Sequence, residues 1–283
     1  MSFIFDPFEL EFMRRAALEV LLLAPLAGIL GTQIVLRGLA FFTHGVGTAT
    51  FPGLVVAGPL GIPPTLAALA VGLSFAGALE RLGRSARLAS DAATALLLVA
   101  ALAIGIVLAS DVYEAGAEVD QLLFGSLLAI GNEEIAATAI VLVVVLIATA
   151  AWRRTWIAAG FDPASARSLR LGVGVADWGL LSAIAIAVVV TLDATGALLV
   201  ASILVIPAAT ARLLVDRLGR LELVAGLIAL AEGTTGLLLA YELDVPPGAT
   251  IAALGGALFV LAAVARAATR SIRSPNAGLG GGG

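Results

Sequence analysis

The chain has 283 residues, of which 60% are hydrophobic and 13% are charged. Soluble domains carry about 25% charged residues, so this composition excludes a soluble globular protein and predicts a polytopic membrane protein. With no cysteine and a single histidine, the chain also lacks the residues for a disulfide framework, a thiolate metal site or a cysteine nucleophile. The N-terminus is acidic and has no basic stretch, so we expect no removable signal peptide.

An amphipathic segment at residues 2–13, expected to lie at the membrane interface, precedes nine apolar stretches. Charged residues or turns rich in Gly and Pro separate each stretch from the next. We therefore expect an all-α, polytopic transmembrane helical bundle that forms one domain over residues 1–273, followed by a disordered glycine-rich tail at 274–283. Because the sixth and seventh stretches are short and closely joined, eight spans is the alternative to nine. The predicted spans are 16–36, 43–59, 65–80, 91–109, 133–151, 174–192, 197–214, 221–241 and 249–265.

The basic residues, all of them arginine, gather on one side of the predicted membrane. Arg14 and Arg15 are the exceptions, and their long side chains can reach the headgroups from the entry segment. Cytoplasmic loops are enriched in Lys and Arg, so we expect a multi-pass protein with its N-terminus outside and its C-terminus in the cytoplasm. Asp177, near an inner helix end, is expected to be solvated. The turns without arginine are 58–64, 110–132, 193–196 and 242–248.

A polar segment interrupts the apolar pattern at residues 158–171. Asp162 fits an N-cap and Pro163 the first position of a helix, while Arg167 lies near the end of that helix, where a cation suits the dipole. The predicted helix ends by Gly172 and is too short to cross a bilayer. It is either an amphipathic turn on the membrane surface or a docking helix for a soluble partner.

The second apolar stretch is expected to be a broken helix. Pro52 cannot donate a hydrogen bond to the Thr48 carbonyl, and nearby glycines weaken the helix further. Broken helices at membrane depth occur where protein or a water-filled cavity covers them, and transporters use them at substrate sites. His44 and Thr48 share one face, which makes them candidates for a transport path. The alternative for His44 is an ordinary interfacial histidine.

Two further residues are unusual inside predicted spans. Pro207 leaves the Ile203 carbonyl without its helical donor, which suits either a packing kink or a path-lining position. Glu232 lies near the centre of the eighth span, where a carboxylate costs about 2.5–3.5 kcal/mol. It is therefore either a functional residue or a carboxyl hydrogen-bonded to a neighbouring helix. We predict that His44, Thr48, Glu232 and Pro207 line the path, with His44 and Glu232 as the metal ligands.

Several blocks resemble the permease subunits of zinc, manganese and iron-chelate ABC importers. In chain order they are Leu30–Arg37, Phe51–Gly53, Gly160–Arg167, Gly196–Arg212 and Tyr241–Thr250. The resemblance covers nearly the whole chain and implies a type II ABC importer-like permease. One departure stands out, because His44 and Thr48 occupy the places of an Asp and a His in the family's second-helix motif, which alters the metal path.

The resemblance also implies partners. The permease would form a homodimer that binds two ATPase subunits in the cytoplasm and a metal-binding protein outside, with lipid around it and no nucleic acid. Phe161, Asp162, Pro163 and Arg167 would then form the docking segment for the ATPase. ATP would bind to that partner, and the permease would hold no permanent cofactor.

The motifs of enzymes are missing from the sequence, which contains no lysine and hence no phosphate-binding loop, no nucleophile elbow and no His-Glu-x-x-His. We therefore predict a transporter subunit rather than an enzyme. One hypothesis is an ATP-driven importer of Zn²⁺, Mn²⁺ or Fe²⁺. The other is an ATP-independent secondary transporter coupled through Glu232.

Overall fold

The computed structural model describes residues 6–85, 90–112, 127, 130–162, 172–215 and 217–273, and within these ranges it contains helices and no strands. The all-α prediction is confirmed. Eight helices of the described part are long and apolar enough to cross a membrane, and a ninth apolar helix, Leu199–Leu214, is shorter. The two alternatives of eight and nine spans thus differ only in how this short helix is counted. The predicted tail at 274–283 lies outside the described residues.

The first span begins earlier than predicted. After the 3₁₀ turn η2 (Asp6–Glu9), one helical run comprises α1 (Glu11–Leu26), the π-helical turn η3 (Ala27–Gly31) and α2 (Thr32–Arg37). A separate interfacial helix at residues 2–13 is therefore wrong for the described part of that segment. Met13 is fully buried in the core, so tertiary packing draws these residues into the first span.

Glycines allow the first span to enter the centre of the bundle. A Cβ atom added at Gly28 would lie 2.5 Å from the backbone oxygen of Glu222, and one added at Gly31 would overlap the backbone oxygen of Leu204. Small residues of this kind let helix backbones approach closely in membranes. The π-helical turn η3 is thus wedged between two other helices.

The second predicted span is broken, as expected. Helix α3 (Ala40–Ala49) ends at Thr50, and α4 (Phe51–Leu60) continues with Pro52 in its first turn. The hydroxyl of Thr50 donates to the Gly47 carbonyl at 2.6 Å, and the Gly53 amide donates to the Thr50 carbonyl at 2.9 Å. These local bonds give partners to the Gly47 and Thr50 carbonyls at the break, where the regular helical pattern ends. Helices α5 (Pro64–Ser85) and α6 (Ser90–Val107), with the π turn η4 (Leu108–Val112), follow.

Helix α8 (Asn132–Phe161) extends ten residues beyond the predicted end of its span. The reason is tertiary, because Trp156 on this extension is fully buried and its indole Nε1 donates to the Ala176 carbonyl of the next helix at 2.7 Å. The beginning of the polar segment at 158–161 is therefore part of α8.

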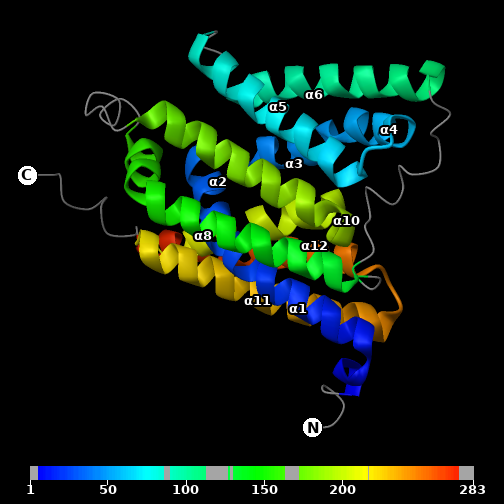
Figure 1. The fold of residues 1–283 in the computed structure, drawn as a ribbon. Helices are drawn as coiled ribbons and strands as arrows, with labels where there is room; N and C mark the ends of the chain where they lie inside the picture. The colour runs from blue at the N-terminus through cyan, green and yellow to red at the C-terminus, as the bar shows by residue number, and fades with distance from the viewer. Residues whose placement is uncertain are drawn as a thin grey trace, which may run out of the picture.

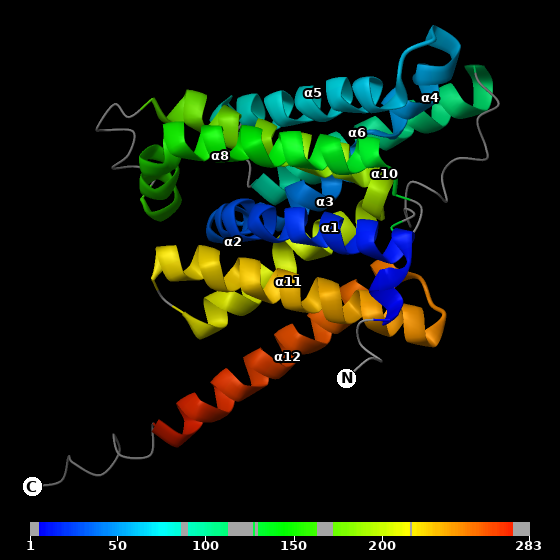
Figure 2. The same ribbon diagram turned by 60° about the horizontal axis from the view of Figure 1, so that its bottom comes forward.

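Helix α10 (Val173–Leu214) occupies the middle of the bundle. It packs against α12 (Pro247–Arg273), α11 (Leu218–Leu243), α8, α5 and α3. At Gly196 its backbone leaves the helical region, with φ of 79°, which confirms the break predicted at 193–196. Figures 1 and 2 show α4, α5 and α6 on one side of the bundle and α11 on the other, with α10 and α3 between them, and Figure 2 shows α12 on the side of α11.

Candidate functional site

His44 and Thr48 lie on the most exposed face of α3 in the described part of the chain. Thr43, Val46 and Gly47 are buried, whereas His44 is exposed and Thr48 is half-buried. Phe41, three residues before His44, is also exposed. We call Phe41, His44 and Thr48 the α3 stripe. The helical spacing that predicted a shared face is confirmed, and this face turns away from α10, α6 and α5, against which α3 packs.

Glu232 lies in a different part of the bundle. Its side chain is buried, with 2% exposure, and a Cβ atom added at Gly255 of α12 would lie 2.8 Å from its Oε2. Oε2 has no hydrogen-bond partner among the described residues. Helix α11 packs chiefly against α1, α10 and α12. The structure therefore does not bring Glu232 together with the α3 stripe within one subunit.

Pro207 sits in a tightly packed segment of α10. It is buried, as is Ala208, whose Cβ would lie 3.1 Å from a Cβ atom added at Gly31. The helix is continuous through Pro207 to Leu214. Pro207 thus lies in the part of α10 whose residues Leu204 and Ala208 meet Gly31 of η3.

No preformed metal site accompanies these residues. Within the described ranges, His, Asp and Glu side chains do not gather in any group of three that could hold an ion. A site for a transported ion must also release it, so transporter sites are built from few or weak ligands. His44 therefore offers one imidazole per chain, at an exposed position.

The sequence analysis missed a second buried carboxyl group, that of Glu19 on α1. Its side chain is fully buried, and its Oε1 accepts a hydrogen bond of 2.7 Å from the Thr138 hydroxyl of α8. Its Oε2 has no partner in the described part of the chain. The available signal was that Glu19 lies inside an apolar stretch. Because Glu19 is close to the start of the predicted span at residue 16, its position also fitted a residue at the membrane interface.

The predicted docking segment begins at the end of α8. Phe161, the last residue of α8, is 67% exposed, and Asp162 leaves the helical conformation with φ of −143°. Its amide donates to the Ala158 carbonyl at 3.0 Å, so Asp162 ends α8. Pro163 and Arg167, together with the N-cap predicted for Asp162, depend on residues 163–171, which lie outside the described residues. Gly172, with φ of 62°, leads into α10.

Arginines join the helix ends around this segment. Arg266 of α12 donates to the carbonyls of Arg212 and Leu213 at 2.9 and 2.7 Å, and Arg212 donates to the Val35 carbonyl at 3.3 Å. Each guanidinium thereby satisfies carbonyl groups at the C-terminal end of a neighbouring helix. A groove of about 670 Å³ opens here, lined by Phe161, both arginines and apolar side chains of α2, α10 and α11.

A part-buried polar cluster joins α2 to the last turns of α8 and the first turns of α10, the two helices that flank the predicted docking segment. Arg37 pairs with Asp177 at 2.5 Å, and its other terminal nitrogen donates to the Trp156 carbonyl at 2.9 Å. We call Arg37, Trp156, Ala176 and Asp177 the Arg37 cluster. The expectation that Asp177 is merely solvated is wrong, because Arg37 approaches it from a helix that is 140 residues away in the sequence.

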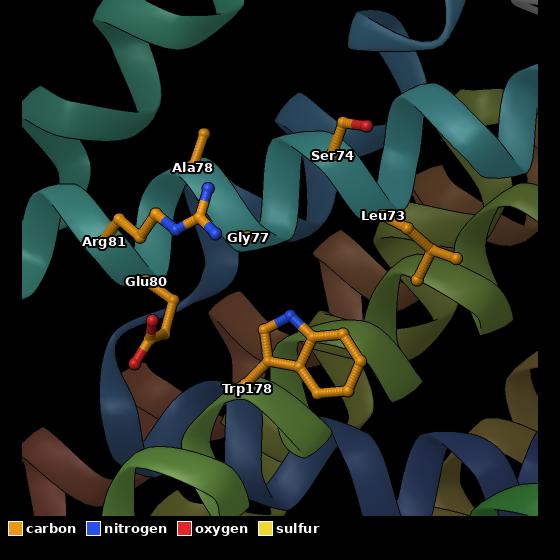
Figure 3. Close-up of a pocket in the computed structure, with 7 residues that line it drawn as sticks. All are labelled: Leu73, Ser74, Gly77, Ala78, Glu80, Arg81 and Trp178. Carbon is orange, nitrogen blue, oxygen red and sulfur yellow. The ribbon is translucent and has the colours of Figure 1, made fainter.

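A second groove, of about 470 Å³, lies between α5 and the first turns of α10 (Figure 3). The indole of Trp178, which is 48% exposed, lies across from Gly77 and Leu73. Its Nε1 would be 3.8 Å from a Cβ atom added at Gly77. This groove brings α5 beside the start of α10, one residue beyond the Arg37 cluster.

Comparison with known proteins agrees with this architecture. The model of a family described as the ABC 3 transport family matches residues 9–266. A probable iron transport system membrane protein of Haemophilus influenzae is 28% identical over 92% of this chain and 96% of its own. A manganese transport system membrane protein of Halalkalibacterium halodurans is also 28% identical, over 93% and 90%.

A solved structure has the same fold. A chain of PsaBC from Streptococcus pneumoniae, in complex with Fab, superimposes with a TM-score of 0.79 at 23% identity, covering 92% of this chain and 94% of that one. The family match spans nearly every described helix, from α1 to α12. The chain therefore belongs to the ABC 3 transport family and is a permease of the metal-transporting kind.

Proposed function

We propose that the chain is the membrane subunit of an ATP-driven importer that carries Zn²⁺, Mn²⁺ or Fe²⁺ into the cytoplasm. The family match over residues 9–266 carries this proposal. The relatives named for iron and manganese transport support the cargo class, as does a chain without cysteine thiolates, which suits these ions better than Cu(I). ATP would be hydrolysed on a separate ATPase subunit that docks on residues 161–172.

The transport route is proposed to run along the α3 stripe, between two copies of the chain. This helix face carries the only histidine and is left exposed by a single subunit. A second copy would cover it and bring a second imidazole to the route. Neutral imidazole is a suitable transient ligand for these divalent ions. The Thr48 hydroxyl, which donates to the His44 carbonyl at 3.4 Å, adds an oxygen on the same face.

Glu232 and Pro207 would join this route only through a change in helix packing. For Glu232, α11 and α12 would have to separate at Gly255, against which the carboxyl group now rests. No contact within the described residues links Glu232 to the α3 stripe, so the ATP-independent transporter coupled through Glu232 gains no support from the packing. An extracytoplasmic metal-binding protein would deliver the ion to the outer end of the route.

Reconstitution tests the proposal directly. The chain is placed in proteoliposomes with its ATPase subunit and binding protein, and uptake of radiolabelled Zn²⁺, Mn²⁺ and Fe²⁺ is measured with and without ATP. We expect uptake that requires ATP and is lost when the catalytic glutamate of the ATPase is replaced. His44→Ala should reduce uptake while the complex still assembles, and Thr234→Ala on α11 serves as its control. Metal uptake that proceeds without the ATPase would overturn the proposal.

A further inference from the structure

We infer that Arg37 is a positioning residue that couples movement of the docking segment to the α3 stripe. The inference rests on the proposed docking of an ATPase on residues 161–172. It concerns how a movement of residues 161–172 would be transmitted to His44, which lies on α3. The Arg37 cluster joins α8 and α10, the two helices that flank the docking segment, to α2, the helix that precedes α3.

The first connection is to the end of α8. The Arg37 guanidinium donates to the Trp156 carbonyl at 2.9 Å, one and a half turns before α8 ends at Phe161. The Arg37 side chain also lies along Gly160, where an added Cβ atom would be 3.9 Å from its Cγ and Nε. Any displacement of the last turn of α8 therefore acts on the Arg37 side chain.

The second connection is to the start of α10. Asp177, in the second turn of α10, pairs with the Arg37 Nη1 at 2.5 Å. Trp156 ties the same turn to α8 through its bond to the Ala176 carbonyl, and it is completely buried. The helices on either side of the docking segment, α8 and α10, are thus hydrogen-bonded to each other, and Arg37 is bonded to both of them.

The third connection leads to the α3 stripe. Arg37 is the last residue of α2, and only Gly38, with φ of 66°, and Leu39 separate it from α3. The Leu39 amide donates to the Ile34 carbonyl at 2.9 Å, and the Leu39 carbonyl accepts from the amide and hydroxyl of Thr43, both at 3.0 Å. The turn between α2 and α3 is therefore short and hydrogen-bonded to both helices. A displacement of Arg37 would for this reason also displace α3, which carries His44.

The side chain chemistry suits a mechanical link. The Arg37 and Asp177 side chains are 12% and 35% exposed, so solvent screens their attraction less than that of a surface pair. Arginine offers several donors in a rigid fork, which lets one side chain bond to a carboxylate and a carbonyl at once. Lysine keeps the charge but lacks this fixed geometry, and therefore separates geometry from charge in a test.

The test measures metal ions imported per ATP hydrolysed, in proteoliposomes that contain the ATPase and the binding protein. Arg37→Lys and Asp177→Asn are compared with Arg153→Gln, which breaks the 2.8 Å pair between Arg153 of α8 and Glu222 of α11. The Arg37–Asp177 pair joins α2 to α10, and the Arg153–Glu222 pair joins α8 to α11. Only the Arg37–Asp177 pair belongs to the cluster that links the helices on both sides of the docking segment. Assembly and thermal midpoint are recorded for every variant.

We expect Arg37→Lys and Asp177→Asn to assemble with the ATPase and hydrolyse ATP, while the ratio of ions to ATP falls roughly tenfold, within the usual range of coupling between sites. Arg153→Gln should leave the ratio unchanged. If Arg37→Lys does not assemble with the ATPase, the ratio measured for Asp177→Asn decides the test. The Asp177 side chain is partly exposed, so the fold tolerates the loss of its charge more easily.

An unchanged ratio in Asp177→Asn would overturn the role of Arg37, as would an equal fall in Arg153→Gln. A loss of thermal stability without a change in the ratio would show a purely structural clamp and would also overturn it. Failure of the proposed function looks different, because then the unaltered chain itself would show no ATP-dependent uptake.

Discussion

The buried contact between Glu19 and Thr138 provides a sharp test of how polar groups stabilise this bundle. The two side chains are fully buried, and the Thr138 hydroxyl donates to the Glu19 Oε1 at 2.7 Å. The other carboxyl oxygen already lacks a partner among the described residues. Thr138→Val removes the hydroxyl with little change of shape, so Oε1 loses its bond and neither carboxyl oxygen has a partner among the described residues.

The expected effect follows from these contacts. Side-chain hydrogen bonds between membrane helices contribute about 0.6 kcal/mol on average and up to about 1.7 kcal/mol, while a buried polar group left unsatisfied costs about 1–3 kcal/mol. Because Glu19 is closed off from solvent and cannot turn to water, we expect Thr138→Val to lower the free energy of unfolding by about 1–3 kcal/mol. Denaturant unfolding in detergent micelles, followed by tryptophan fluorescence, measures it.

Thr149→Val on the same helix is the matched control. The Thr149 hydroxyl donates to the Val145 carbonyl of its own helix at 2.7 Å, so its loss leaves no buried group without a partner, and we expect a change within about 0.5 kcal/mol. Replacing both partners, as in Glu19→Leu with Thr138→Val, should recover stability. Equal stabilities of Thr138→Val and Thr149→Val would refute the argument that the carboxyl group depends on this contact.

Three further predictions follow from individual residues. Gly28→Ala places a Cβ atom 2.5 Å from the backbone oxygen of Glu222, which cannot turn aside, and should destabilise the fold by about 1–3 kcal/mol in thermal or chemical unfolding. Gly256→Ala enters open space and should stabilise the fold by about 0.5–1 kcal/mol; the reverse order of the two variants would contradict this packing. Phe161→Ala should change stability by less than about 0.5 kcal/mol because the side chain is exposed, but it should weaken ATPase binding in a pull-down titration, and undiminished binding would argue against docking there. A cysteine introduced by Gly116→Cys should react with an impermeant thiol reagent in intact cells and one introduced by Ser165→Cys only after lysis, a test with no background since the chain has no cysteine; labelling of the second in intact cells would reverse the orientation.

The sequence by itself determined the class of fold and several of its breaks. Length and apolarity of each stretch depend on local residues and the thickness of a bilayer, so the spans were predictable one by one. The break before Pro52 and the turn that ends at Gly196 follow from backbone chemistry, since proline lacks an amide donor and glycine adopts positive φ readily. The shared face of His44 and Thr48 needed only the helical period.

Tertiary structure decided the features that join distant parts of the chain. Helix α8 continues to Phe161 because Trp156 is buried against α10, and a local pattern cannot reveal that burial. The partners of Glu19 and Arg37 are 119 and 140 residues away, and Glu232 rests on Gly255 of another helix rather than near His44. Hydropathy alone places an apolar residue in a span, but the partner of a buried polar group depends on which helices meet, and packing between helices sets that choice.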